Sequence, residues 1–179
     1  MKQETYRSSA RRENKLHKSK IDFRPRNKNS YLPFEKFAED ANHFIKEVAI
    51  ELQTEDLHLA LRVTKAVLHA LRDRLQADSA VEFGQGLPMM IKAIYFDQYD
   101  LSDTPVIIRS QQGFIDFIRE KDSQMSDIDF LDPQDVIIGL QAVFVVLENT
   151  MDYFQVRQVK QQLPKEIQHL IDVYEPYER

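Results

Sequence analysis

The chain has 179 residues, of which 30% are charged and 42% hydrophobic, which is typical of one globular domain or two small subdomains. The absence of cysteine excludes disulfides and thiolate metal sites, and four glycines are too few for an all-β fold with many tight turns. No apolar run approaches the roughly 18 residues that span a bilayer, and the N-terminus lacks the apolar core of a signal peptide, so we expect a cytoplasmic protein with no membrane partner.

The net charge of −5 conceals two regions of opposite charge. Residues 1–30 contain ten basic and three acidic residues, a net charge of +7, whereas the other residues contain 14 basic and 26 acidic residues, a net charge of −12. The basic segment has few apolar side chains, so folding alone would not offset its loss of conformational entropy. We therefore expect residues 1–30, termed the basic arm, to be extended and to be disordered when unbound.

The composition of the basic arm suits contact with RNA, and the ribosome is the leading candidate partner. Basic side chains neutralise phosphates and release counterions, while aromatic side chains stack on bases. The candidate RNA-binding residues are Arg7, Arg11, Arg12, Lys15, Lys18, Lys20, Arg24, Arg26, Lys28, Tyr6 and Phe23. The alternatives are a solubilising tail, or an arm that lies on the acidic surface of its own body or of a neighbouring copy.

Downstream of the basic arm, apolar residues recur at helical spacing. An apolar stripe at three- and four-residue intervals predicts a first helix over 34–52. Thr54 is expected to cap a second helix that ends near Leu75, with Leu57 and Leu61 among its inward-facing residues.

Two shorter helices are expected to follow. The sequence Ser79-Ala80-Val81-Glu82 has the form of a capping box and predicts the start of a third helix. Gly84 and Gly86 are expected to end that helix, and Pro88 suits the first position of a fourth.

The same pattern returns in the second half of the chain at a constant offset. Ala66-Val67-Leu68 corresponds to Ala142-Val143-Phe144, and Leu87-Pro88 corresponds to Leu163-Pro164. Asp132-Pro133-Gln134-Asp135 supplies a cap, a proline and an acid at the start of the second long helix. An internal repeat of this kind indicates a duplicated helical unit.

We therefore predict an all-α protein in which two copies of a four-helix unit pack into one helical bundle behind the extended basic arm. The predicted segments are the arm at 1–30, a first helical repeat at 31–97, a linker at 98–112 and a second helical repeat at 113–175.

The two long helices differ in their outer faces. The first carries a stripe that we expect to be a secondary basic face, either bound to phosphates or solvated and paired with nearby acids. Its residues are His58, Arg62, Lys65, His69 and Arg72.

In the second long helix, only Gly139 and Gln141 interrupt the apolar residues of Val136–Leu147. Such a helix is either the central helix of the bundle or part of a self-association surface. A homo-oligomer through Val136–Leu147 is therefore an alternative function, as a structural or adaptor protein. A small-molecule site between the repeats is another.

The sequence has no catalytic motif and no glycine-rich phosphate loop. Asp127, Asp129 and Asp132 form an acidic cluster that lacks the glycine and closing glutamate of a calcium loop. His58 and His69 would lie three helical turns apart, about 16 Å, which is too far to share a metal. We therefore expect no enzymatic activity, no cofactor and no metal site.

Three elements resemble a bacterial family, the domain of unknown function family 2267. They are the helix sequence of residues 66–75, Gly86-Leu87-Pro88 and Gln162-Leu163-Pro164. The resemblance covers about residues 37–173 and implies a small helical protein with a doubled unit and without known catalytic residues. The basic arm lies outside it and would be an addition to the family body.

Overall fold

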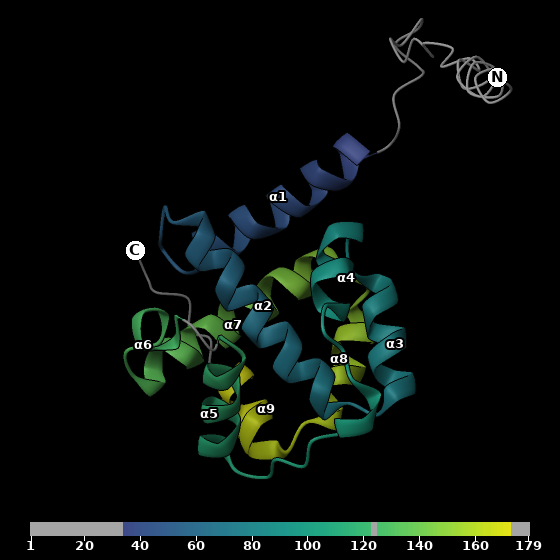
Figure 1. Ribbon diagram of the computed structural model, residues 1–179, viewed down its shortest axis with the longest axis vertical. Helices are drawn as coiled ribbons and strands as arrows, with labels where there is room; N and C mark the ends of the chain where they lie inside the picture. Colours follow the sequence, from purple (N-terminus) through teal and green to yellow (C-terminus); the bar gives the residue numbers. More distant parts are fainter. Residues whose placement is uncertain (1–33, 123–124, 173–179) are drawn as a thin grey trace, which may run out of the picture. The chain divides into compact units, whose positions relative to one another are not determined.

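The computed structural model describes residues 34–122 and 125–172, which contain helices and no strand, so the predicted all-α class is confirmed (Figure 1). The described residues belong to one compact unit. The helices are α1 (Phe34–Glu51), α2 (Leu57–Arg74), α3 (Ala77–Gly86), α4 (Met89–Phe96), η2 (Leu101–Asp103, a 3-10 helix), α5 (Gln111–Lys121), α6 (Ser126–Asp129), α7 (Pro133–Thr150), α8 (Tyr153–Gln162) and α9 (Lys165–Asp172).

The basic arm and its candidate RNA-binding residues, from Tyr6 to Lys28, lie outside the described residues. No helix in the described part of the chain combines the length and apolar character needed to cross a membrane.

Helices α2 and α7 pack against each other, and α1, also of 18 residues, and α5 pack around them (Figure 1). Helix α1 contacts α2, α4 and α7, while α5 contacts α2 and α7. Helices α2 and α7 cross closely at Gly139, where an added Cβ would lie 2.8 Å from Cγ1 of Val63. A glycine is therefore required there because the neighbouring helix occupies the space of a side chain.

The apolar sequence of α7 allowed two interpretations, a central helix of the bundle or part of a self-association surface. In the structure, α7 is a central, buried helix. Val136, Leu140, Val143 and Leu147 are each 0% exposed within this chain's own core. Ile138 is its exception, with 40% of its surface exposed. The hydrophobic core of a single chain therefore accounts for most of the apolar residues of this helix.

The predicted cap at the start of α7 is confirmed, because Asp132 and Asp135 form a reciprocal capping box. The carboxylate of Asp132 accepts hydrogen bonds from the backbone N–H groups of Gln134 and Asp135, at 2.7 and 3.2 Å. The prediction that Thr54 caps α2 is wrong. Asp56 is the N-cap, and its carboxylate accepts from the N–H groups of His58 and Leu59.

The predicted capping box at Ser79 is also wrong, since α3 begins two residues earlier, at Ala77. Ser79 lies inside the helix, where its hydroxyl accepts a hydrogen bond from Nε2 of Gln162 in α8 at 3.2 Å. Gly84 does not end α3 but lies within it. A Cβ at Gly84 would approach the ring of Phe96 to 2.6 Å, so the glycine allows α3 and α4 to pack closely.

The expected inward orientation is wrong at Phe34, Leu57 and Leu61, which are 66%, 43% and 36% exposed. Helical periodicity places them on the same stripe as the core residues. Phe34 and Leu57 are the first residues of α1 and α2, and Leu61 lies one turn after Leu57. The second repeat was expected to begin at residue 113, whereas α5 begins at Gln111 after the Ser110 cap.

Replacing Gly139 with alanine should destabilise the protein despite the better helix propensity of alanine. Overpacking against Val63 should cost about 1–3 kcal/mol, which exceeds the roughly 1 kcal/mol of propensity gained. Urea unfolding followed by circular dichroism measures this loss. In the Val63→Ala background, Gly139→Ala should cost less stability than it does in the parent protein. Additive effects of the two substitutions would contradict the proposed contact.

Candidate functional site: a charged groove between α2 and α5

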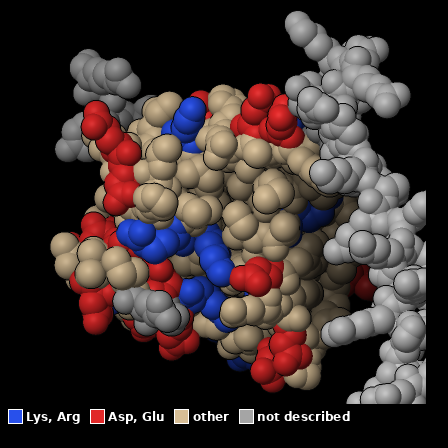
Figure 2. All heavy atoms as spheres, turned by 45° about the horizontal axis from the view of Figure 1, so that its top comes forward, with Lys and Arg blue, Asp and Glu red and all other residues tan. Residues whose placement is uncertain are grey.

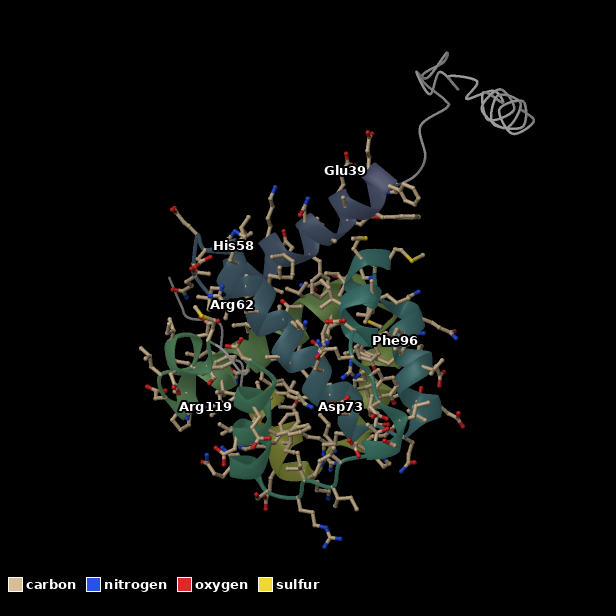
Figure 3. The ribbon with its side chains drawn as sticks, in the orientation of Figure 1. Glu39, His58, Arg62, Asp73, Phe96 and Arg119 are labelled. Atoms are coloured by element: carbon tan, nitrogen blue, oxygen red, sulfur yellow. The ribbon has the colours of Figure 1, made fainter. Side chains whose placement is uncertain are left out.

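A groove with a volume of about 460 Å³ lies between α2, the segment that follows α4, and the C-terminal end of α5. Four residues of the predicted secondary basic face line it, namely Arg62, Lys65, His69 and Arg72. Figure 2 shows basic side chains as a band across one face of the molecule with acidic side chains beside it. In Figure 3, Arg62 and Asp73 lie toward opposite ends of α2.

Arg72 lies at the base of the groove and is 2% exposed. Its Nη1 donates to the backbone carbonyls of Tyr95 and Asp97, at 2.5 and 2.8 Å, at the C-terminal end of α4. Its Nε donates to the carboxylate of Asp73 at 2.6 Å, and the guanidinium lies 4.7 Å from the ring centroid of Tyr99. A cation is favourable here because the last carbonyls of a helix lack intrahelical donors.

His69 and Lys65 bind the same end of α4. Nε2 of His69 lies 2.7 Å from the carbonyl oxygen of Ile94, and because a carbonyl only accepts, this nitrogen carries the proton. Burial lowers the pKa of His69, which keeps the ring neutral at pH 7. A hydrogen bond from Lys65 Nζ, at 2.8 Å, holds the pKa of Asp97 below its ordinary value.

The expectation of an outer basic stripe is therefore wrong for His69 and Arg72, which are 5% and 2% exposed. Their three- and four-residue spacing correctly placed them on one face of α2. The spacing did not reveal that the C-terminus of α4 covers this face and uses both side chains as donors.

Asp73 and Lys121 connect α2 with α5. Lys121 Nζ lies 2.6 Å from Asp73 Oδ2, and the ammonium lies 4.4 Å from the ring centroid of Phe117. Burial alone would raise the pKa of Asp73, but the hydrogen bonds from Arg72 and Lys121 lower it below the ordinary value. Neither Asp73 nor Lys121 was identified from the sequence, because an isolated charged residue carries no periodic signal.

At the other end of the groove, Arg62 binds Asp129 and lies near Asp122. Nε and Nη2 of Arg62 both donate to the Asp129 carboxylate, whose side chain is 2% exposed. Burial, the negative charge of Asp129 and a hydrogen bond between the two carboxyls raise the pKa of Asp122 to about 6, although Arg62 opposes this shift.

The three carboxylates of the predicted acidic cluster have separate roles. Asp129 binds Arg62, and Asp132 caps α7. The side chain of Asp127 is 98% exposed and lies 4.0 Å from Arg119. In the described segments, no three potential ligands are close enough to hold a metal ion.

The corresponding face of α7 has different chemistry. When α2 and α7 are aligned from their first residues, the positions of Arg62, Lys65, His69 and Arg72 are occupied by Ile138, Gln141, Val145 and Glu148. Gln141 Nε2 donates to the carbonyl oxygen of Leu170 at 2.7 Å, near the C-terminal end of α9. A neutral amide thus binds a backbone carbonyl of α9, whose last residue Asp172 pairs with Lys160 of α8, whereas His69 and Arg72 bind the carbonyls at the end of α4.

The fold and the groove define an all-helical protein with a charged interhelical groove. The model of a family of uncharacterised conserved proteins, the domain of unknown function family 2267, matches residues 41–170. This match covers most of the chain and confirms the resemblance, so the chain belongs to this family. No curated protein matches the chain in sequence.

Replacing Arg72 with glutamine should lower the free energy of unfolding by about 3 kcal/mol or more, because it removes the cation from the α4 carbonyls and one of the two cations that bind the buried Asp73 carboxylate. Lys65→Gln is the matched control, since both partners in the Lys65–Asp97 pair are substantially exposed, and it should change stability little. Urea unfolding measures both variants. Equal losses would show that burial of Arg72 has no special role.

Asp122→Asn should stabilise the protein at pH 7 and have little effect near pH 4. The pKa of this acid is about 6 in the folded protein, compared with 3.8 for an ordinary aspartate, so folding favours its protonated form. Stability from this group is therefore present below pH 4 and is lost as the pH rises through 6. The difference in melting temperature between variant and parent, measured from pH 4 to 8, should grow with pH. A constant difference would exclude this titration.

Proposed function

We propose that this protein is a non-catalytic helical binding protein whose basic arm docks on RNA, with the ribosome as the large target. The observation that supports the proposal is the separation of charge between an arm of +7 and a remainder of −12. An acidic body is repelled by phosphates, so a basic segment that tethers it to RNA is needed.

The pairing of the groove cations supports the assignment of RNA contact to the arm. Arg62 binds Asp129 and Lys65 binds Asp97, while Arg72 and Lys121 share Asp73. A phosphate at the groove would compete with a carboxylate for each of these cations. The acidic partners thus reduce the attraction of this face for a polyanion, which weakens the earlier expectation of a secondary RNA-binding face.

The body is proposed to consist of two copies of a four-helix unit related by an approximate two-fold axis. Helices α7, α8 and α9 have the same lengths and the same spacing along the chain as α2, α3 and α4, so one constant offset relates all three pairs. Val63 and Gly139, which meet where α2 and α7 cross, occupy the same position in their respective helices.

Contacts between α3 and α8 follow the same symmetry. Gln162 binds Ser79, and the repeat equivalents of these two residues, Gly86 and Gln155, also lie against each other. The first helix of each unit packs on both long helices, since α1 and α5 each contact α2 and α7. These shared contacts join the two units into one scaffold.

Self-association has less support than RNA binding. Its basis in the sequence was the apolar segment Val136–Leu147 together with the opposite charges of the arm and the body, and the core of the same chain buries most of that segment. The apolar pattern is therefore explained without a second copy.

Replacing Arg7, Arg11 and Arg12 with glutamine in the full chain should weaken binding to single-stranded RNA and to purified ribosomes. If each arginine neutralises one phosphate, the slope of log K against log salt should fall in magnitude by about 2. Fluorescence anisotropy measures the oligonucleotide, and co-sedimentation at several salt concentrations measures the ribosome.

The control carries Lys46→Gln, Arg109→Gln and Lys165→Gln, which remove the same charge from exposed positions on the body. This variant should retain the parent salt dependence. Equal weakening by both triple variants would mean that net charge, rather than the arm, controls binding.

A further inference from the structure

The two sides of the charged groove present opposite charges. On α2, the side chains of Arg62 and Lys65 are 29% and 40% exposed. Glu120 and Asp122 line the groove at the C-terminal end of α5, where the intervening Lys121 is paired with Asp73. The volume of about 460 Å³ is in the range of small-molecule sites, and the two charged sides would fix the orientation of a dipolar ligand.

The charges of this groove exceed what the fold requires. At the related position between α7 and α9, Gln141 donates to a backbone carbonyl of α9, Lys160 pairs with Asp172, and Ile138 and Val145 occupy the positions of Arg62 and His69. Two of the charged or polar positions of α2 are therefore apolar in the related helix. Buried and half-buried charges carry a desolvation cost, so their concentration in one groove indicates a role beyond packing.

Asp122 and Asp129 form a pair of neighbouring carboxyls beside the groove. When Asp122 is protonated, its carboxyl forms a hydrogen bond with that of Asp129. Two ionised carboxylates this close repel each other, so a proton or a cation beside them is favourable. An ammonium group is a suitable donor because it supplies both hydrogen atoms and positive charge next to the Asp122 and Asp129 carboxyls.

Arg62 and Lys65 have N–H donors that their hydrogen bonds to described residues do not use. Arg62 binds Asp129 through Nε and Nη2, which leaves Nη1 available. The Lys65 ammonium has three N–H donors, of which one binds Asp97. Arg62 and Lys65 are three residues apart and lie on the same face of α2. A ligand carboxylate could therefore bind both cations while their existing pairs stay intact.

We propose that the charged groove binds a small zwitterion of the α-amino-acid class, with its ammonium group on Asp122 and its carboxylate on Arg62 and Lys65. This site uses none of the arm residues and is independent of the RNA-binding proposal. Because an ammonium group favours ionised Asp122, binding should weaken as the pH falls below about 6.

The test is a titration of the isotope-labelled full chain with L-alanine, L-glutamine and L-lysine, followed by two-dimensional NMR. At least one amino acid should cause saturable shifts in the backbone amides of Gln98, Lys121 and Asp122. Acetate and methylamine, which carry one charged group each, should bind at least tenfold more weakly. Failure of all three amino acids to bind, or equally tight binding of either single-charge probe, would overturn the proposal.

Asp122→Asn tests the assigned ammonium contact and should weaken amino-acid binding at least tenfold. The same substitution is expected to stabilise the fold at pH 7, so unfolding would not account for a loss of binding. Asp127→Asn is the matched control, since Asp127 is a neighbouring carboxylate whose side chain is 98% exposed. Unchanged affinity in Asp122→Asn, or equal weakening in both variants, would also refute the site.

Discussion

The buried guanidinium of Arg72 connects α2 with α4 directly and with α5 through Asp73. It donates to the last carbonyls of α4 and to Asp73 on its own helix, and Asp73 in turn binds Lys121 at the end of α5. A buried cation is tolerated only where its hydrogen-bonding groups are satisfied, so the positions of α4 and α5 relative to α2 depend on this contact. The charged groove lies where these three helices meet around Arg72 and Asp73.

The two halves of the body meet the same structural requirement with different chemistry. The last carbonyls of α4 accept hydrogen bonds from His69 and Arg72, whereas a carbonyl of α9 accepts from the amide of Gln141 and its last residue, Asp172, pairs with Lys160. A neutral donor carries a lower desolvation cost than a buried cation. The buried guanidinium of Arg72 therefore distinguishes the charged groove from the related contact in the second half.

The arm and the groove are proposed to bind different partners for a common electrostatic reason. The groove cations lie beside carboxylates, which suits a small ligand that carries both charges. The arm has a net charge of +7, which suits an extended polyanion. Because the two proposals use separate residues, either one can fail while the other holds.

The sequence by itself determined the helical class, the capping box at Asp132, the constant offset between the two sets of helices and the family. These are local or periodic features, because helix formation and capping depend on residues within one or two turns. Only the tertiary structure decided which faces are covered, as shown by exposed Leu57 and buried Arg72. It also brought together Arg62 and Asp129, which are 67 residues apart. Helical spacing shows which side chains share a face, but the identity of the opposing surface depends on the packing of the whole chain.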